Sequence, residues 1–367
     1  MRIVRLAMRN FRSYAAADVE LGGGVTIVTG RNGAGKTNLL DALYFGCTGR
    51  SARTTNEREL VRFGQQVVRV EVTTEAADGR HELSVGFTPG EPKRMMADGV
   101  RVERLLDVPG RPLVSVFLPD RLELIKGTPS LRRAHMDQLV AALWPARVAT
   151  RRAYAQALAQ RNALLARIRV GGAAPASLSA WDVELARHGV ALMSDRAAAI
   201  AAVAEHFAAR ADELGLDGEP AVAYRPRSKA VDAEQLAAEL AERRAQDVER
   251  GFTGHGPHRD DLLLSREGRE LRAYGSQGQQ RLGLLALLLA EREAIAATRE
   301  ATPVMLLDDV MSELDRDRRA RLVGLLRDRG QSVITTTDLE HVPGGDEPGV
   351  THLSVVDGAI VREAEAA

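Results

Sequence analysis

A complete phosphate-binding loop is the feature that most limits what this sequence can fold into. Eight consecutive residues match the pattern G-x-x-x-x-G-K-[ST]: Gly30, Arg31, Asn32, Gly33, Ala34, Gly35, Lys36 and Thr37. A β-branched run at residues 25–28 precedes the loop, and a helical pattern of apolar residues follows from Lys36 to about Cys47. The strand–loop–helix order predicts an α/β fold with a nucleotide site.

The residue types of this loop suit a nucleotide phosphate. Its glycines allow a backbone with positive φ that brings N–H groups close to phosphate oxygens, and the helix that follows adds the positive end of its dipole. We expect Lys36 to reach the β- and γ-phosphates and the Thr37 hydroxyl to ligate Mg²⁺. The loop therefore predicts ATP and Mg²⁺ as cofactors.

A second acidic motif ends an apolar strand late in the chain. Residues 304–307 are Val-Met-Leu-Leu, and Asp308 and Asp309 follow directly. In phosphate-loop proteins this is the Walker B position, so we expect Asp308 to hold Mg²⁺ and Asp309 to position or deprotonate the attacking water. Lys36, Asp308 and Asp309 are then the catalytic residues. Many ATPases of this type carry Glu where this chain has Asp309, so we expect slow hydrolysis.

The sequence distance between the two motifs narrows the choice among classes of phosphate-loop protein. Lys36 and Asp308 lie 272 residues apart, a gap that compact GTPases and kinases do not need. ATPases of the ABC and SMC group do need it, because an insertion splits their heads. Such heads also carry a signature motif at a helix start, which meets the γ-phosphate bound by a partner subunit. We assign that role to Ser276, Gly278 and Gln279, although Gln277 replaces a glycine of the ABC pattern.

The composition changes along the chain in a way that fits a split head. Residues 128–250 are rich in Ala, Leu, Arg and Glu and mostly helical, without a sustained heptad, whereas strand patterns dominate on both sides. We predict an α/β fold, a split ABC-type ATPase head with an inserted, mainly helical lobe. The predicted parts are residues 1–125 (head), 126–250 (helical lobe) and 251–367 (head).

Two short strings follow the acidic strand. Residues 312–315, Ser-Glu-Leu-Asp, match the D-loop of dimeric heads, and residues 335–338, Thr-Thr-Thr-Asp, end the next strand. Relatives often place a switch histidine at that point. This sequence has no histidine there, so Thr337 or Asp338 is the candidate for the switch residue.

Together these motifs resemble the RecF family of bacterial DNA replication and repair proteins. Beside the phosphate loop, the strings that carry the resemblance are Asn10-Phe11-Arg12-Ser13-Tyr14, Gly256-Pro257-His258-Arg259-Asp260-Asp261-Leu262 and the run from Leu306 to Asp315. The resemblance implies a DNA-dependent ATPase with weak activity that dimerises on ATP and acts in gap repair and the SOS response. It also implies binding to single- and double-stranded DNA, and work with RecO and RecR to load RecA.

The charges give a candidate DNA surface. The chain has a net charge of zero, yet residues 121–170 hold ten Lys or Arg against two Asp or Glu. Residues 181–250 hold nine against fourteen, so the acidic half could instead pair with the basic one. Few aromatics interleave with the basic residues, which favours contact with the duplex backbone over base stacking. The named candidates are Arg132, Arg133, Arg151, Arg152 and Arg161, with Arg167 and Arg169 beside them.

The sequence also permits other interpretations. The single cysteine, Cys47, and an apolar run of only nine residues, Leu282–Ala290, favour a cytoplasmic protein without a membrane partner. A transporter ATPase subunit, an SMC-type head and a nucleotide switch that hydrolyses little are the alternatives. His255 and His258 near Asp260 could form a metal cluster, but the family string explains them better.

Overall fold

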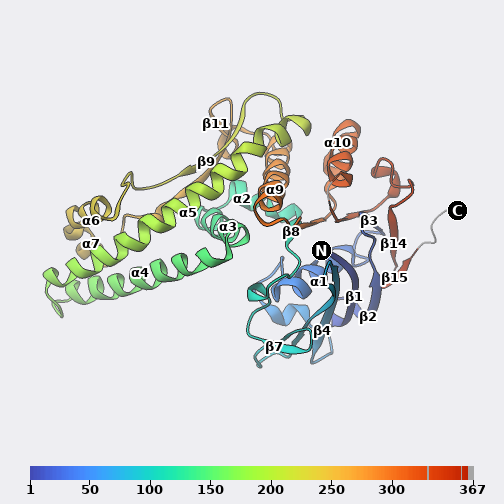
Figure 1. The fold of residues 1–367 in the computed structure, drawn as a ribbon, viewed down its shortest axis with the longest axis horizontal. Helices are drawn as coiled ribbons and strands as arrows, with labels where there is room; N and C mark the ends of the chain where they lie inside the picture. Colours follow the sequence, from blue (N-terminus) through green and yellow to red (C-terminus); the bar gives the residue numbers. More distant parts are fainter. Residues whose placement is uncertain (329, 357, 363–367) are drawn as a thin grey trace. The chain divides into compact units, whose positions relative to one another are not determined.

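The computed structural model describes residues 1–328, 330–356 and 358–362. The chain forms two compact units: Met1–Arg121 with Ile295–Ala367, and Leu122–Ala294. The first unit therefore joins the two ends of the chain, drawn in blue and red in Figure 1. The phosphate loop and Asp308 belong to this same unit.

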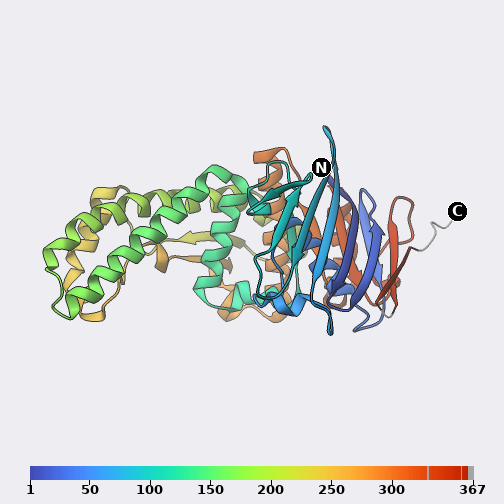
Figure 2. The same cartoon turned by 90° about the horizontal axis from the view of Figure 1, so that it is seen from below.

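One layer of the first unit is an antiparallel sheet. Its strand order is β2-β1-β4-β5-β6-β7, and Figure 2 shows its strands lying side by side. Alternation of apolar and polar residues buries one face, as in β4, where Val68, Val70 and Val72 are buried. The strands are β1 (Arg2–Phe11), β2 (Tyr14–Glu20), β4 (Val68–Ala76), β5 (Gly79–Phe87), β6 (Arg94–Ala97) and β7 (Val100–Val102).

The second layer is a mostly parallel sheet with the order β15-β14-β3-β13-β12-β8. Its strands β3, β13 and β12 are buried along almost their whole length, as expected for strands covered on both faces. The strands are β3 (Val25–Thr29), β8 (Val114–Phe117), β12 (Val304–Leu307), β13 (Ser332–Thr336), β14 (Thr351–Val356) and β15 (Ala359–Arg362), the last antiparallel.

Helix α1 (Lys36–Thr48) packs between the two sheets and contacts strands of both. Residues from α1 and from each sheet share one apolar core that includes Phe11, Phe45 and Leu306. Gly49 ends the helix in the left-handed conformation at φ 70°, where its N–H donates to the carbonyl of Phe45. The helix that starts at the phosphate loop is thus held from both sides. Helix α10 (Arg316–Arg327), which starts with Asp315 as its N-cap, completes the unit.

The second unit is mainly helical. Helices α4 and α5 run side by side and α6 packs on α5 (Figure 1), while β9, β10 and β11 form a small antiparallel sheet. The helices are α2 (Glu123–Lys126), α3 (Pro129–Leu143), α4 (Val148–Arg169), α5 (Leu178–Glu213), α6 (Ala233–Glu242), α7 (Arg244–Arg250), α8 (Leu271–Tyr274) and α9 (Gln277–Arg299), whose last residues belong to the first unit. The strands are β9 (Pro220–Arg225), β10 (Asp261–Arg266) and β11 (Arg269–Glu270).

The observed units differ from the predicted division at one end of the insertion. Residues 251–294 group with the helical unit, whereas the sequence placed everything from residue 251 in the head. The reason is a strand pairing: β10 pairs along its whole length with β9, which lies inside the segment predicted as helical. No helix in the described part of the chain is long and apolar enough to cross a membrane.

Candidate nucleotide site

The phosphate loop lies between β3 and α1, and its glycines are required by their positive φ values and, at Gly30 and Gly35, by close contacts. Gly30, Gly33 and Gly35 have φ values of 152°, 84° and 120°. A Cβ added at Gly30 would lie 2.6 Å from the carbonyl oxygen of Val355. One added at Gly35 would lie 3.0 Å from the Tyr14 hydroxyl, which donates to the Gly35 carbonyl. The backbone therefore takes a path that only glycine allows.

Lys36 is folded into this loop. Its side chain is buried, and its ammonium donates to the carbonyls of Gly30 at 2.7 Å and Arg31 at 3.1 Å. Burial lowers the pKa of Lys36, and the nearby charges of Asp309 and Asp308 oppose that shift. The loop thus holds one desolvated positive charge close to two carboxylates. Arg31, Asn32 and Gly33 are exposed and Ala34 is half-buried.

The structure brings Thr37 and Asp308 into direct contact. The Thr37 hydroxyl is 3.0 and 2.9 Å from the two carboxylate oxygens of Asp308, although 271 residues separate them in the chain. Burial raises the pKa of Asp308, and hydrogen bonds from Thr335 and Thr37 oppose the shift. A hydroxyl and a carboxylate are oxygen ligands of the kind that Mg²⁺ prefers. The donor set therefore fits the predicted metal.

Asp309 adopts a left-handed conformation at φ 46° and ψ 29°. Its backbone N–H donates to the Thr335 hydroxyl at 3.0 Å. Its Oδ1 is buried and has no hydrogen-bond partner among the described atoms. An unsatisfied carboxylate oxygen beside Lys36 and Asp308 is what a group that orients water or a metal-bound ligand should show.

Residues to which the sequence analysis gave no role in the site support the segment beside it. Asp41 on α1, whose carboxylate is fully buried, pairs with Arg12 at 2.8 Å and accepts hydrogen bonds from Ser51 and from the N–H of Ala52. The next segment carries Arg53, which donates to Asn38 and whose charge opposes the rise that burial causes in the pKa of Asp308. Asp41 thus fixes the segment that brings a positive charge near the acidic pair.

The signature residues lie in the second unit, at the start of α9. The N–H of Gln279 donates to the Ser276 hydroxyl at 3.2 Å, and the N–H of Ser276 donates to the Gln279 side chain at 2.9 Å. This reciprocal capping box satisfies two backbone donors at the helix start. Ser276 and Gly278 are exposed, so the helix N-terminus is presented to solvent.

Side chains of the two strings at residues 312–315 and 335–338 form hydrogen bonds with the nearby backbone. Ser312 donates to the carbonyl of Asp309 at 2.8 Å, and Asp315 caps α10. Thr337 and Asp338 are exposed, and the Asp338 carboxylate accepts from the N–H of Glu340. In the described contacts, the residue of this strand that touches Asp308 is Thr335, two positions before the predicted Thr337.

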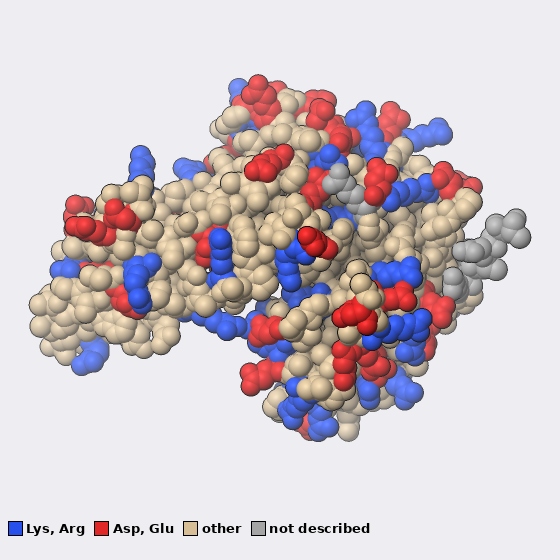
Figure 3. All heavy atoms as spheres, viewed as in Figure 1, with Lys and Arg blue, Asp and Glu red and all other residues tan. Residues whose placement is uncertain are grey.

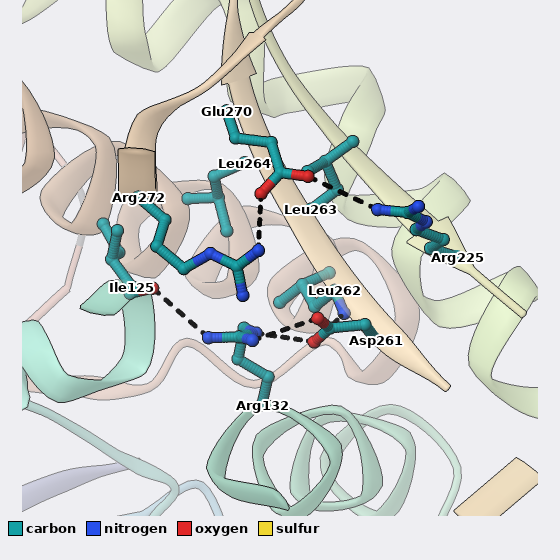
Figure 4. Close-up of a pocket in the computed structure, with 9 residues that line it drawn as sticks. All are labelled: Ile125, Arg132, Arg225, Asp261, Leu262, Leu263, Leu264, Glu270 and Arg272. Carbon is teal, nitrogen blue, oxygen red and sulfur yellow. Dashed lines mark hydrogen bonds and ion pairs between the residues drawn. The ribbon is translucent and has the colours of Figure 1, made fainter. Parts of the chain in front are cut away.

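The predicted DNA contacts need a correction. Arg132 and Arg161 are buried, so neither can reach a DNA phosphate. Arg132 pairs with Asp261 at 2.6 Å and donates to the carbonyl of Gly127; Figure 4 shows its guanidinium pointing at Asp261. Arg161 is completely enclosed by acidic and hydroxyl partners in the helical unit.

The other three candidates have different surroundings. Arg133 is half-buried and donates to the carbonyl of Asp260. Arg151 is exposed but pairs with Asp137 at 2.9 Å. Arg152 is exposed and makes no ion pair among the described residues. Of the five, Arg152 is best placed to meet a phosphate.

The open face of the antiparallel sheet is not uniformly basic. Its arginines alternate with acids, and Figure 3 shows basic and acidic side chains interspersed on the visible side of the first unit. Arg5 pairs with Asp18 at 2.5 Å, and Arg69 pairs with Glu71 at 2.6 Å. Arg5 and Asp18 lie on the neighbouring strands β1 and β2, where opposite charges stabilise the pairing, whereas Arg69 and Glu71 lie two residues apart on β4. Local ion pairs therefore balance charges on this face.

Comparison with known proteins decides the family. Residues 5–107 match a family model described as an AAA domain. The chain is 39% identical to the DNA replication and repair protein RecF of Myxococcus xanthus, over 100% of this chain and 98% of that protein. It belongs to the RecF family. The RecF protein of Heliobacterium modesticaldum is 37% identical over 92% of this chain and 93% of its own.

Solved structures agree with this assignment. A recombination mediator protein RecF bound to ATP superposes with a TM-score of 0.87 at 28% identity, covering 99% of this chain and 97% of that one. An SMC head bound to the C-terminal winged-helix domain of ScpA gives a TM-score of 0.61 at 18% identity, which shows the fold alone. The predicted family and the predicted ATPase-head fold are both confirmed.

Proposed function

We propose that this chain is a RecF-type recombination mediator that binds ATP with Mg²⁺, hydrolyses it slowly and couples the nucleotide to DNA binding. The contact between Thr37 and Asp308 carries the nucleotide part, because it joins the phosphate loop to the acidic strand end. Two similar solved RecF structures, whose names give the ligands as ATP and ATPrS and the pathway as RecFOR, support ATP as the nucleotide.

Each residue of the site has a distinct task in hydrolysis. Lys36 would exchange the carbonyls of Gly30 and Arg31 for the β- and γ-phosphates, which are stronger acceptors. Thr37 and Asp308 would hold Mg²⁺, which neutralises charge that develops on the phosphoryl oxygens. Asp309 would orient the attacking water through its unpaired oxygen. Its side chain is one methylene shorter than Glu, which keeps the reaction slow.

Binding of ATP would also join two chains. The start of α9 offers an exposed helix N-terminus with the Ser276 hydroxyl, Gly278 and Gln279, an arrangement that attracts anions. We infer that it meets the γ-phosphate held by a second copy. ADP cannot make this contact, so hydrolysis would release the dimer.

Substitution of Ser276 by Arg tests the dimer. We expect the S276R variant to bind ATP like the wild type and to remain monomeric with ATP, because a long cationic side chain obstructs the helix start. Light scattering with and without ATP measures this. Ser130→Arg, which adds the same charge at an exposed position on α3, is the matched control. ATP-induced dimers of normal stability in S276R would refute the trans contact.

DNA binding is proposed for the open face of α4. This 22-residue helix contains no Asp or Glu, and its exposed positions are Arg, Gln, Ala and a terminal stretch with Arg167 and Arg169. Small neutral residues between arginines leave room for a phosphate backbone and add no repulsion. Arg152 and Arg167 mark the two ends of this face.

Replacing both arginines by alanine should weaken DNA binding in a salt-dependent way. If each contacts one phosphate, the slope of log K against log salt falls by about 2 in magnitude. Fluorescence anisotropy with a gapped duplex at several salt concentrations measures it. Arg187→Ala, which removes an exposed arginine paired with Glu184 on α5, should leave the slope unchanged. An unaltered slope in the double variant would remove α4 from the DNA interface.

The remaining partners rest on the family. By resemblance we propose that the protein acts in the cytoplasm in gap repair and the SOS response, with RecO and RecR, and helps load RecA. It would bind single-stranded and duplex DNA at gaps or junctions. The full-length RecF match argues against a transporter subunit. A slow nucleotide switch remains the second candidate because of Asp309, and a single-turnover hydrolysis rate that DNA leaves unchanged would favour it.

One experiment addresses the whole proposal. Sedimentation velocity of the full chain with and without ATP, and with and without a gapped duplex, follows dimerisation and DNA binding together. We expect a dimer only with ATP, and co-sedimentation with DNA that is stronger in the ATP state. A monomer under all four conditions would contradict the proposed coupling.

A further inference from the structure

One hydroxyl contacts both residues of the acidic pair. Thr335, at the end of β13, is fully buried. Its Oγ1 donates to the Asp308 carboxylate at 2.7 Å and accepts from the backbone N–H of Asp309 at 3.0 Å. A single side chain therefore sets the carboxylate of one aspartate and the backbone of the next.

The sheet places this hydroxyl where it is needed. Strands β12 and β13 are parallel neighbours, with Leu307 opposite Ile334, so the residues that follow these two positions lie side by side. On its other side β13 pairs with β3, where Thr335 lies opposite Val28, close to the start of the phosphate loop. Thr335 thus occupies the strand between the two halves of the site.

The chemistry of Asp308 explains why a hydroxyl is required there. This carboxylate is buried and accepts side-chain hydrogen bonds from Thr37 and Thr335. When Thr37 serves as a metal ligand, Thr335 remains as the fixed donor that holds the orientation of Asp308. A valine of the same shape would leave a buried carboxylate oxygen and a backbone N–H without this partner.

The backbone of Asp309 depends on the same contact. A left-handed conformation is costly for a residue other than glycine and needs support from its surroundings. The hydrogen bond from the Asp309 N–H to Thr335 supplies such support and fixes the direction of the Asp309 side chain. Loss of the hydroxyl would free this turn.

We propose that Thr335 is a positioning residue for nucleotide hydrolysis, whose hydroxyl orients Asp308 toward the metal and holds Asp309 toward the attacking water. This inference rests on the proposed ATPase function. The positioning role proposed for Thr335 is separate from the switch role that the sequence pattern gave to Thr337 or Asp338.

The test compares three variants of the full chain. Thr335→Val removes the hydroxyl, Thr335→Ser keeps it, and Thr336→Val removes a buried hydroxyl one residue along the strand, which donates to the carbonyl of Asp338. The first readout is the Mg²⁺ dependence of binding of a fluorescent ATP analogue. The second is the single-turnover rate of ATP hydrolysis.

We expect Thr335→Val to need more Mg²⁺ for tight binding and to hydrolyse about 10- to 100-fold more slowly, the range for losing a hydrogen bond to a charged group. Its affinity for the analogue in EDTA should equal that of the wild type. Thr335→Ser should recover most of the rate, and Thr336→Val should behave like the wild type.

Two results would overturn the inference. One is a normal Mg²⁺ dependence and a normal rate in Thr335→Val. The other is an equal loss in Thr335→Val and Thr336→Val without recovery in Thr335→Ser, which would make the effect purely structural. Failure of the proposed function looks different, because the wild type would then show no hydrolysis. In that case the Mg²⁺ dependence of nucleotide binding would still test whether Thr335 orients Asp308.

Discussion

Replacing Lys36 with alanine is expected to lower the affinity for ATP by at least about 100-fold and to leave the protein folded. The ammonium is the positive charge inside the phosphate loop, and the carbonyls that it contacts are weak acceptors compared with phosphate oxygens. Loss of one or two charge-assisted hydrogen bonds accounts for an effect of this size. Because burial already disfavours the charged form of Lys36, its removal should cost little folding stability.

Equilibrium dialysis with labelled ATP measures the affinity, and circular dichroism monitors the fold. Lys229→Ala is the matched control, since Lys229 is one of four lysines and is exposed in the other unit. It should bind ATP normally. Dialysis that finds intact binding in Lys36→Ala would remove the phosphate loop from the nucleotide site.

Local patterns in the sequence predicted the elements around the site well. The helix expected from Lys36 to about Cys47 is observed as Lys36–Thr48, and the strand expected to end within residues 335–338 is observed as Ser332–Thr336. Both are set by residues close in sequence: the periodicity of apolar side chains and the glycines at the ends. The two-layer arrangement with α1 between two sheets could not be predicted in the same way, because it depends on strand pairings between the two ends of the chain.

The candidate site likewise combines residues that local sequence reveals with residues that only strand pairing brings together. The phosphate loop is one continuous string, so its residues are recognisable together. Thr335 is hidden in a β-branched run that any buried strand would favour, and only its register against β12 reveals the contact with Asp308. A residue whose role comes from a neighbouring strand leaves little trace in a single sequence.

Charge counts did not identify the DNA contacts correctly, because they contain no information on burial. The excess of arginine in residues 121–170 suggested phosphate contacts, yet two of the five candidates are buried. The helical periodicity of the sequence could have indicated that Arg161 is buried. It shares one face of α4 with four buried side chains, Tyr154, Ala157, Leu165 and Ile168. An arginine on an apolar stripe indicates an internal ion pair rather than a DNA contact.

Arg161 anchors a buried polar cluster in the helical unit. Its guanidinium donates to Asp182 at 2.7 Å and to Asp247 and Thr253 at 2.8 Å each, and all three partners are buried. These partners come from α5, from α7 and from the segment after α7. Arg244 also pairs with Asp182. One side chain thus ties three segments to α4.

Replacing Arg161 with methionine should destabilise the helical unit by about 3–5 kcal/mol, because it leaves buried carboxylates without their partner. Urea unfolding of the full chain measures this. Arg152→Ala, on the exposed face of the same helix, should change stability by less than about 0.5 kcal/mol. Adding Asp182→Asn and Asp247→Asn to Arg161→Met should recover part of the loss, since the uncompensated charges are then removed. If Arg161→Met instead kept its full stability and lost affinity for DNA, the buried ion-pair role would be wrong and the phosphate contact would be restored.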